Sequence, residues 1–65
     1  MSTVALADQI ACVRRELAMR QRVYPRWVSA GKMTQADSDR EITTMIAVLA
    51  TLQEVQRQRE PGLFA

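Results

Sequence analysis

The sequence contains no histidine and only one cysteine, Cys12. Without histidine it has neither an imidazole for proton transfer at neutral pH nor a Cys–His pair for nucleophilic catalysis. A disulfide within the chain is excluded because it needs a second cysteine. The usual Cys/His zinc sites are excluded because they need several such ligands and the chain has one. Cys12 lies among apolar residues, so we expect it to be a small buried side chain and a free thiol in a reducing compartment.

Glycine and proline are scarce, with two of each, and no glycine-rich phosphate loop is present. The seven acidic residues fall at the ends and exposed faces of the expected helices. Asp37, Asp39 and Glu41 alternate along one helix, so their carboxylates point in different directions and are not expected to hold a cation. We therefore expect no enzymatic activity, no metal and no cofactor.

Long hydrophobic runs are missing too. The longest nearly apolar stretch, residues 42–52, includes threonines and is shorter than the roughly 20 residues of a membrane-spanning helix. The first residues lack the positive charge that begins a secretory signal. A soluble cytoplasmic protein that does not enter a membrane is the expectation.

The sequence does contain a first helical pattern over about residues 3–30. Ser2 or Thr3 can cap its start. Its apolar side chains follow the spacing of three and four of one helix face, with Gln21 interrupting the series: Leu6, Ile10, Val13, Leu17 and Tyr24.

Pro25 interrupts this first pattern and leaves two readings open. The helix could end near Tyr24, with a short second helix beginning at Pro25, or it could continue with a kink near residues 24–25. Trp27 and Val28 lie three and four positions after Tyr24, so they continue the apolar face of the first helix in the same helical phase. This phase favours a single kinked helix.

A tight turn over residues 31–34 follows. Gly31 can adopt the left-handed conformation that ends helices, and Thr34 with Asp37 has the spacing of a capping box. The second pattern predicts a helix over residues 35–59 and a short tail over residues 60–65. A connection this short makes the helices antiparallel, so we predict an all-α helical hairpin that forms one domain over residues 1–65.

The second helix is more apolar than one partner helix requires. Its apolar side chains form a broad face: Ile42, Met45, Ile46, Val48, Leu49, Leu52 and Val55. A chain of 65 residues buries only about 60% of its unfolded surface and is marginally stable alone. We therefore expect a homo-oligomeric helical bundle, with a dimer as the default.

Basic residues concentrate near the corner of the hairpin. Eight of the nine are arginine, and five arginines fall between positions 14 and 26 against one acid, Glu16. Arginine presents planar donors to phosphate or carboxylate, and aromatic rings can stack on a base. The candidate site for an anionic ligand or an acidic partner is Arg20, Arg22, Tyr24, Arg26, Trp27 and Lys32. The alternative is that both aromatic residues are core residues and the arginines are solvated or paired with helix acids.

The corner resembles a group of small uncharacterised proteins encoded by tailed phages and prophages. The resemblance rests on the stretches 14–28, 31–34 and 39–42, with Tyr-Pro-Arg-Trp-Val before Gly-Lys-Met-Thr as its most specific part. It implies a protein made in a bacterial host. Small phage proteins of this kind are often inhibitors of host systems or oligomeric sponges for nucleotide signals in antiphage defence.

We therefore predict a non-catalytic binding protein that inhibits or sequesters a host component. Its partner could be a host protein or an anionic nucleotide. The low net charge of +2 makes a nucleic-acid-binding accessory protein a weaker alternative. A purely structural oligomerisation module is the remaining alternative.

Overall fold

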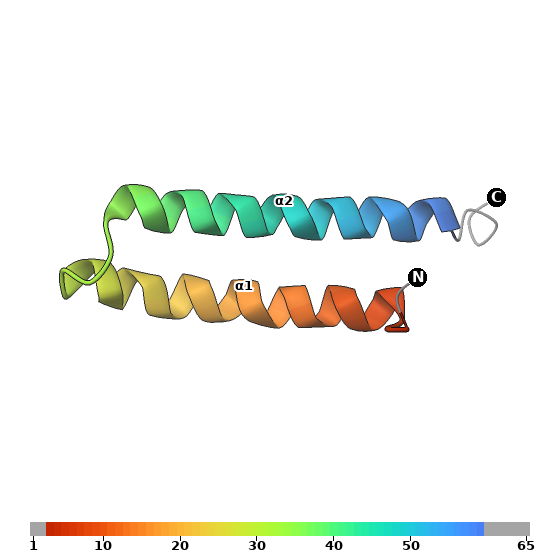
Figure 1. Ribbon diagram of the computed structural model, residues 1–65, viewed down its shortest axis with the longest axis horizontal. Coiled ribbons are helices and arrows are strands. Elements are labelled where there is room, and N and C mark those ends of the chain that lie inside the picture. Colours follow the sequence, from red (N-terminus) through yellow and green to blue (C-terminus); the bar gives the residue numbers. More distant parts are fainter. Residues whose placement is uncertain (1–2, 60–65) are drawn as a thin grey trace.

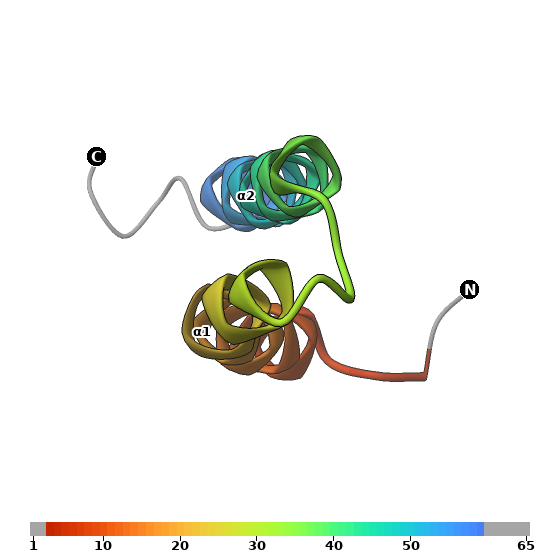
Figure 2. The same ribbon diagram turned by 90° about the vertical axis from the view of Figure 1, so that its left-hand side faces the viewer.

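The computed structural model describes residues 3–59, which form two α-helices. Helix α1 spans Leu6–Ser29 and helix α2 spans Gln35–Arg59. They lie antiparallel and side by side, joined by a short turn (Figure 1). Viewed along their length, no third element covers either flank within the described residues (Figure 2). The predicted all-α helical hairpin is confirmed, while the expected tail over residues 60–65 lies outside the described residues.

Helix α1 begins later than the sequence suggested. Its N-cap is Ala5, which makes no side-chain cap hydrogen bond. Thr3 lies two residues before this position, and Ser2 lies outside the described residues. Instead, the Gln9 Nε2 donates to the Val4 carbonyl oxygen at 2.9 Å. The start of α1 is therefore fixed without the expected hydroxyl cap.

Pro25 lies inside α1, and the helix continues for four residues beyond it. The reading in which a second helix begins at Pro25 is therefore wrong. The size of any bend near residues 24–25 stays a prediction. Because α1 is continuous, the side chains on both sides of Pro25 keep one helical phase.

A Schellman motif ends α1. Gly31 has a φ of 75°, the left-handed conformation that a residue without a Cβ adopts at little cost. Its N–H donates to the Val28 carbonyl at 3.0 Å, and the Lys32 N–H donates to the Trp27 carbonyl at 2.9 Å. These bonds satisfy two of the free carbonyls at the helix end and turn the chain sharply.

Thr34 begins α2. Its hydroxyl accepts a hydrogen bond from the Asp37 N–H at 3.0 Å. The Asp37 carboxylate accepts a hydrogen bond from Arg40 within α2. Of the two hydrogen bonds of a capping box, the bond to the Thr34 side chain is present.

The core between the helices is thin. Among the described residues, the buried apolar side chains are Ile10 and Tyr24, with 4% and 8% exposure. Helix α2 contributes one buried residue, Ser38, while Ile46 and Val48 are exposed. One helix thus covers only part of the apolar surface of α2, as its composition suggested.

Cys12 is exposed, so the expectation that it is buried is wrong. It follows Ile10 by two positions, a rotation of about 200° around the helix, which places it away from the core side. Neither described helix is long and apolar enough to cross a membrane.

Candidate functional site

The six predicted site residues do not form one cluster. Arg20, Tyr24 and Trp27 follow the 3-and-4 spacing and form a linked group. Arg22 and Arg26 are exposed and lie on the opposite face of α1, and Lys32 lies in the turn. The separation follows from helix geometry, since two positions correspond to about 200° of rotation.

Arg20 joins the two helices. Its Nε donates to Glu16 Oε1 at 2.9 Å within α1, and its Nη1 donates to the Glu41 carbonyl oxygen on α2 at 3.3 Å. The same Nη1 lies 3.6 Å from Glu41 Oε2. Only 18% of the Arg20 side chain is exposed. These contacts give Arg20 a structural role and use two of the five N–H donors of its guanidinium group.

Tyr24 completes this group with Trp27. The Arg20 guanidinium carbon lies 5.8 Å from the centre of the Tyr24 ring, within cation–π range. The Tyr24 and Trp27 rings stack, with centroids 5.4 Å apart and planes inclined by 29°. Tyr24 is buried, whereas Trp27 is 41% exposed. Of the two aromatic residues, only Trp27 therefore offers substantial surface to a partner.

The pKa of Arg20 is raised above its ordinary value, chiefly by the hydrogen bond from its side chain to Glu16. Partial burial acts in the opposite direction, and the nearby Glu41 carboxylate adds a smaller favourable effect. Arg20 is therefore a permanent cation, and its charge is used to link α1 to α2.

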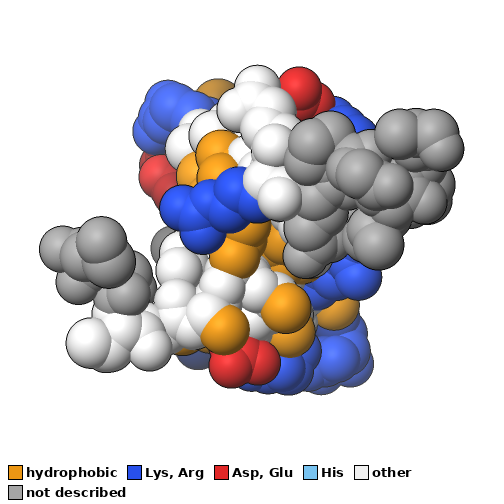
Figure 3. Space-filling view, turned by 90° about the vertical axis from the view of Figure 1, so that its right-hand side faces the viewer, with side chains coloured by type: hydrophobic (Ala, Val, Ile, Leu, Met, Phe, Trp, Pro, Cys, Tyr) orange, Lys and Arg blue, Asp and Glu red, His pale blue; other side chains and the backbone are white. Residues whose placement is uncertain are grey.

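A second set of arginines lies on the outer face of α1. Arg15, Arg22 and Arg26 are spaced by seven and four positions, so they follow one stripe of the helix. All three are exposed, and none makes an ion pair within the described part of the chain. Figure 3 shows basic side chains gathered on the side of α1 that faces away from α2. We call these three residues the arginine row.

The arginine row has defined neighbours. Met19 lies within the same stripe, four positions after Arg15, and is half-buried. Asp8 lies seven positions before Arg15 on the same side of α1, so the positive charge of this side ends before the amino-terminal turn of the helix. Arg15 was not among the predicted site residues. The spacing of seven between Arg15 and Arg22 is the sequence signal that would have identified it.

A hollow lies on α2, and none of the six predicted residues lines it. Its lining is formed by Thr44, Ala47, Val48, Thr51 and Leu52. Within residues 3–59, no three Cys, Asp or Glu side chains gather in a way that could hold a metal ion. Within residues 3–59, the predicted site residues therefore offer a charged outer surface and do not line the hollow on α2.

A comparison with protein-family models, curated proteins and solved structures finds no match for this chain. The resemblance to small phage proteins therefore stays a prediction.

Proposed function

We propose that this protein is a non-catalytic binding protein, of the kind that phages and prophages encode, that inhibits a host component through contact with its acidic surface. The arginine row supplies that contact. The observation that supports this proposal most directly is that Arg15, Arg22 and Arg26 are exposed, aligned and without an ion pair in residues 3–59.

The linked group around Arg20 is a weaker candidate. Arg20 already bonds to Glu16 and to the backbone of Glu41, so its recruitment by a ligand would break contacts between the helices. Tyr24 is buried and cannot stack on a base without rearrangement. We assign this group to the stability of the hairpin, with Trp27 at the edge of the binding surface.

The shape of the arginine row favours a protein partner over a small nucleotide. The row extends for about 16 Å along the helix at a rise of 1.5 Å per residue, and it lies on the convex outer side of α1. Ligand sites for small molecules are concave and bury most of the ligand. A nucleotide sponge would need a site formed between copies of the chain.

The residue types also favour a protein partner over nucleic acid. Arginine and methionine are enriched at protein interfaces while lysine is depleted, and Met19 lies on the same stripe of α1 as the three arginines of the row. Three cations per chain would release few counterions from nucleic acid and would give weak binding at physiological salt. An acidic protein surface can instead pair each guanidinium with a carboxylate in bidentate geometry.

The test is capture of partners from a bacterial lysate by three tagged proteins. They are the natural sequence, a row variant with Arg15, Arg22 and Arg26 replaced by alanine, and a control variant. The control replaces three exposed arginines outside the row, namely Arg14, Arg40 and Arg57. Both variants lose three positive charges and gain three alanines. The control also removes the exposed ion pairs of Arg40 with Asp37 and of Arg57 with Glu54, and exposed pairs of this kind contribute little to stability.

We expect a host protein to be retained by the natural sequence and the control but lost from the row variant, with or without nuclease treatment. Loss from both variants alike would show that net charge alone is responsible, and this would contradict the proposal. Retention that disappears with nuclease would favour the nucleic-acid alternative.

A further inference from the structure

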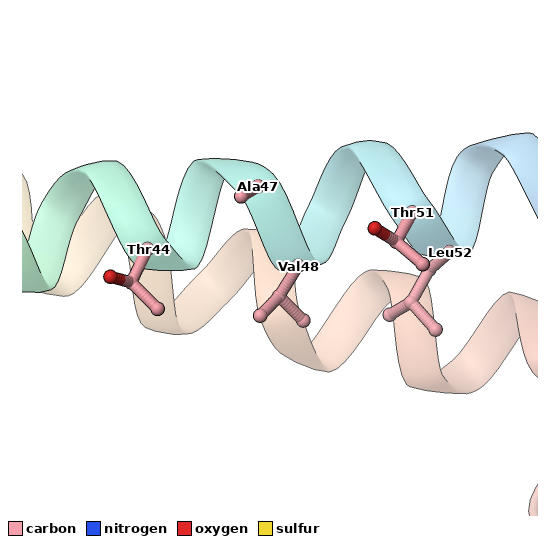
Figure 4. A pocket seen from close by; sticks show the side chains of 5 residues that line it. All are labelled: Thr44, Ala47, Val48, Thr51 and Leu52. Carbon is pink, nitrogen blue, oxygen red and sulfur yellow. The ribbon is translucent and has the colours of Figure 1, made fainter.

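The hollow on α2 lies on an apolar face that no other element of residues 3–59 lines. Its five lining residues come from α2 alone and recur at positions i, i+3, i+4, i+7 and i+8, the spacing of one side of a helix. Figure 4 shows these five side chains distributed along α2, with α1 contributing none of them. Val48 lies near the middle and is 40% exposed. We call Thr44, Ala47, Val48, Thr51 and Leu52 the α2 stripe.

The hairpin has a physical reason to cover this face. Its described core holds two buried apolar side chains, Ile10 and Tyr24. Chains of this size usually need a disulfide, a metal or oligomerisation to reach useful stability. The single cysteine excludes the first within one chain. Burial of the α2 stripe against a second helix would supply the missing apolar contact.

The charges on α2 indicate which helix fits. Asp37 lies in the first turn and Arg59 in the last turn. Each is eleven positions from Val48, one on either side, and both fall close to the phase of the α2 stripe. In an antiparallel pair centred on Val48, each Asp37 would therefore lie at the level of the partner's Arg59. Arg59 makes no ion pair within the described residues, whereas Asp37 already pairs with Arg40 and would accept the partner's Arg59 on its carboxylate as well.

A parallel pair would have the opposite electrostatics. It would place Asp37 beside a second Asp37 and Arg59 beside a second Arg59, and it would align the two helix dipoles unfavourably. Like charges at both ends would oppose such an arrangement. The charge distribution of α2 thus favours antiparallel pairing with a copy of itself.

We propose that the α2 stripe is the interface of a two-fold homodimer, in which α2 packs antiparallel against α2 of a second copy with Val48 at the axis. The two hairpins then form a four-helix assembly. This proposal does not depend on the function of the arginine row. Because the row lies on the side of α1 away from α2, one dimer would present two rows to its partners.

The experiment compares Val48→Glu with Ile46→Glu by sedimentation equilibrium over a range of protein concentrations. Ile46 is a matched control because it is also β-branched, lies on the same helix and is 48% exposed, but it lies outside the α2 stripe. We expect the natural sequence and Ile46→Glu to be dimers. In Val48→Glu two carboxylates would meet at the axis, which should raise the dissociation constant by roughly a hundredfold or more.

A charge exchange tests the orientation and does not depend on the folding of Val48→Glu. Asp37→Arg and Arg59→Asp should each weaken the dimer by roughly tenfold, because each places like charges opposite one another at both ends. The double variant carrying both substitutions should recover most of the affinity, since the pairs are restored with reversed sign. Circular dichroism on each variant confirms that the helices are intact.

Three results would overturn the proposal. The natural sequence could sediment as a single chain at every concentration. Ile46→Glu could dissociate the dimer while Val48→Glu leaves it intact, which would place the interface on the other flank of α2. The double charge variant could also be no tighter than the single variants, which would exclude the antiparallel register.

Discussion

At the scale of single residues, Arg20 and Arg22 lie in different environments although they are two positions apart. Arg20 bonds to Glu16 and Glu41 and lies over the Tyr24 ring, whereas Arg22 is exposed and makes no ion pair within the described residues. The sequence analysis predicts one site for both because both are arginines near the corner of the hairpin. Their helical phase separates them, and that separation could be recognised only once the face of α1 toward α2 was known.

Replacement of Arg20 by alanine should lower the free energy of unfolding by about 1 kcal/mol, because the charged hydrogen bonds are partly exposed and screened. Arg22→Ala is the control and should change stability by less than about 0.5 kcal/mol. Urea denaturation measures both values. Equal effects of the two substitutions would contradict the structural role of Arg20.

The effect of Arg20→Ala should not vary with pH across the neutral range. The pKa of Arg20 is raised in the folded protein. A cation with a raised pKa contributes stability that is fully present below its unfolded pKa and is lost only as the pH rises through the folded value. For arginine this loss occurs at strongly alkaline pH.

At the scale of elements, local chemistry explains where the helices meet. Gly31 and Thr34 were identified from the sequence because a left-handed residue and a hydroxyl cap act on their own neighbours. The sequence predicts a start near residue 3, which is too early. A hydroxyl at Thr3 can cap a helix, but it determines the start less strongly than the packing of apolar side chains, which begins at Leu6. Ser38 was not anticipated as buried, since nothing in its local pattern distinguishes a polar residue on the inner face.

Pro25 is the element-scale feature with the largest expected effect. A proline inside a helix lacks the N–H that would bond to the carbonyl four residues earlier and is less favourable than alanine by about 3 kcal/mol. Pro25→Ala should therefore raise the free energy of unfolding by about 1–3 kcal/mol. Gln21→Ala, an exposed change one turn earlier, should have little effect. A loss of stability in Pro25→Ala would show that a bend at this position is needed for packing.

At the scale of the whole molecule, the hairpin has two surfaces with different properties. The outer face of α1 is basic, and the α2 stripe is apolar with opposite charges near its two ends. The excess of apolar residues on α2 was visible in the sequence, because seven apolar side chains are too many for one seam. Which flank is left exposed could not be predicted, since this depends on how α1 is rotated against α2.

If the protein is a dimer, its thermal stability must depend on concentration. Association stabilises the folded state by mass action, so the Tm of the natural sequence should rise by several degrees between micromolar and hundredfold higher concentration. Val48→Glu should lose this dependence, whereas Ile46→Glu should keep it. Differential scanning calorimetry at several concentrations measures the effect, and a constant Tm for the natural sequence would indicate an independent monomer.

The central claim is that the arginine row contacts an acidic host protein, and site-specific photo-crosslinking in bacterial cells tests it most directly. A photoreactive amino acid replaces Met19, which lies between Arg15 and Arg22 on the same stripe of α1, or, as a control, the exposed Ala50 on α2. Crosslinking at position 19 but not at position 50, to one protein with an acidic surface, is the predicted result. Replacement of Arg15, Arg22 and Arg26 by alanine should abolish it. Equal crosslinking at both positions, or adducts at position 50 alone, would contradict the claim.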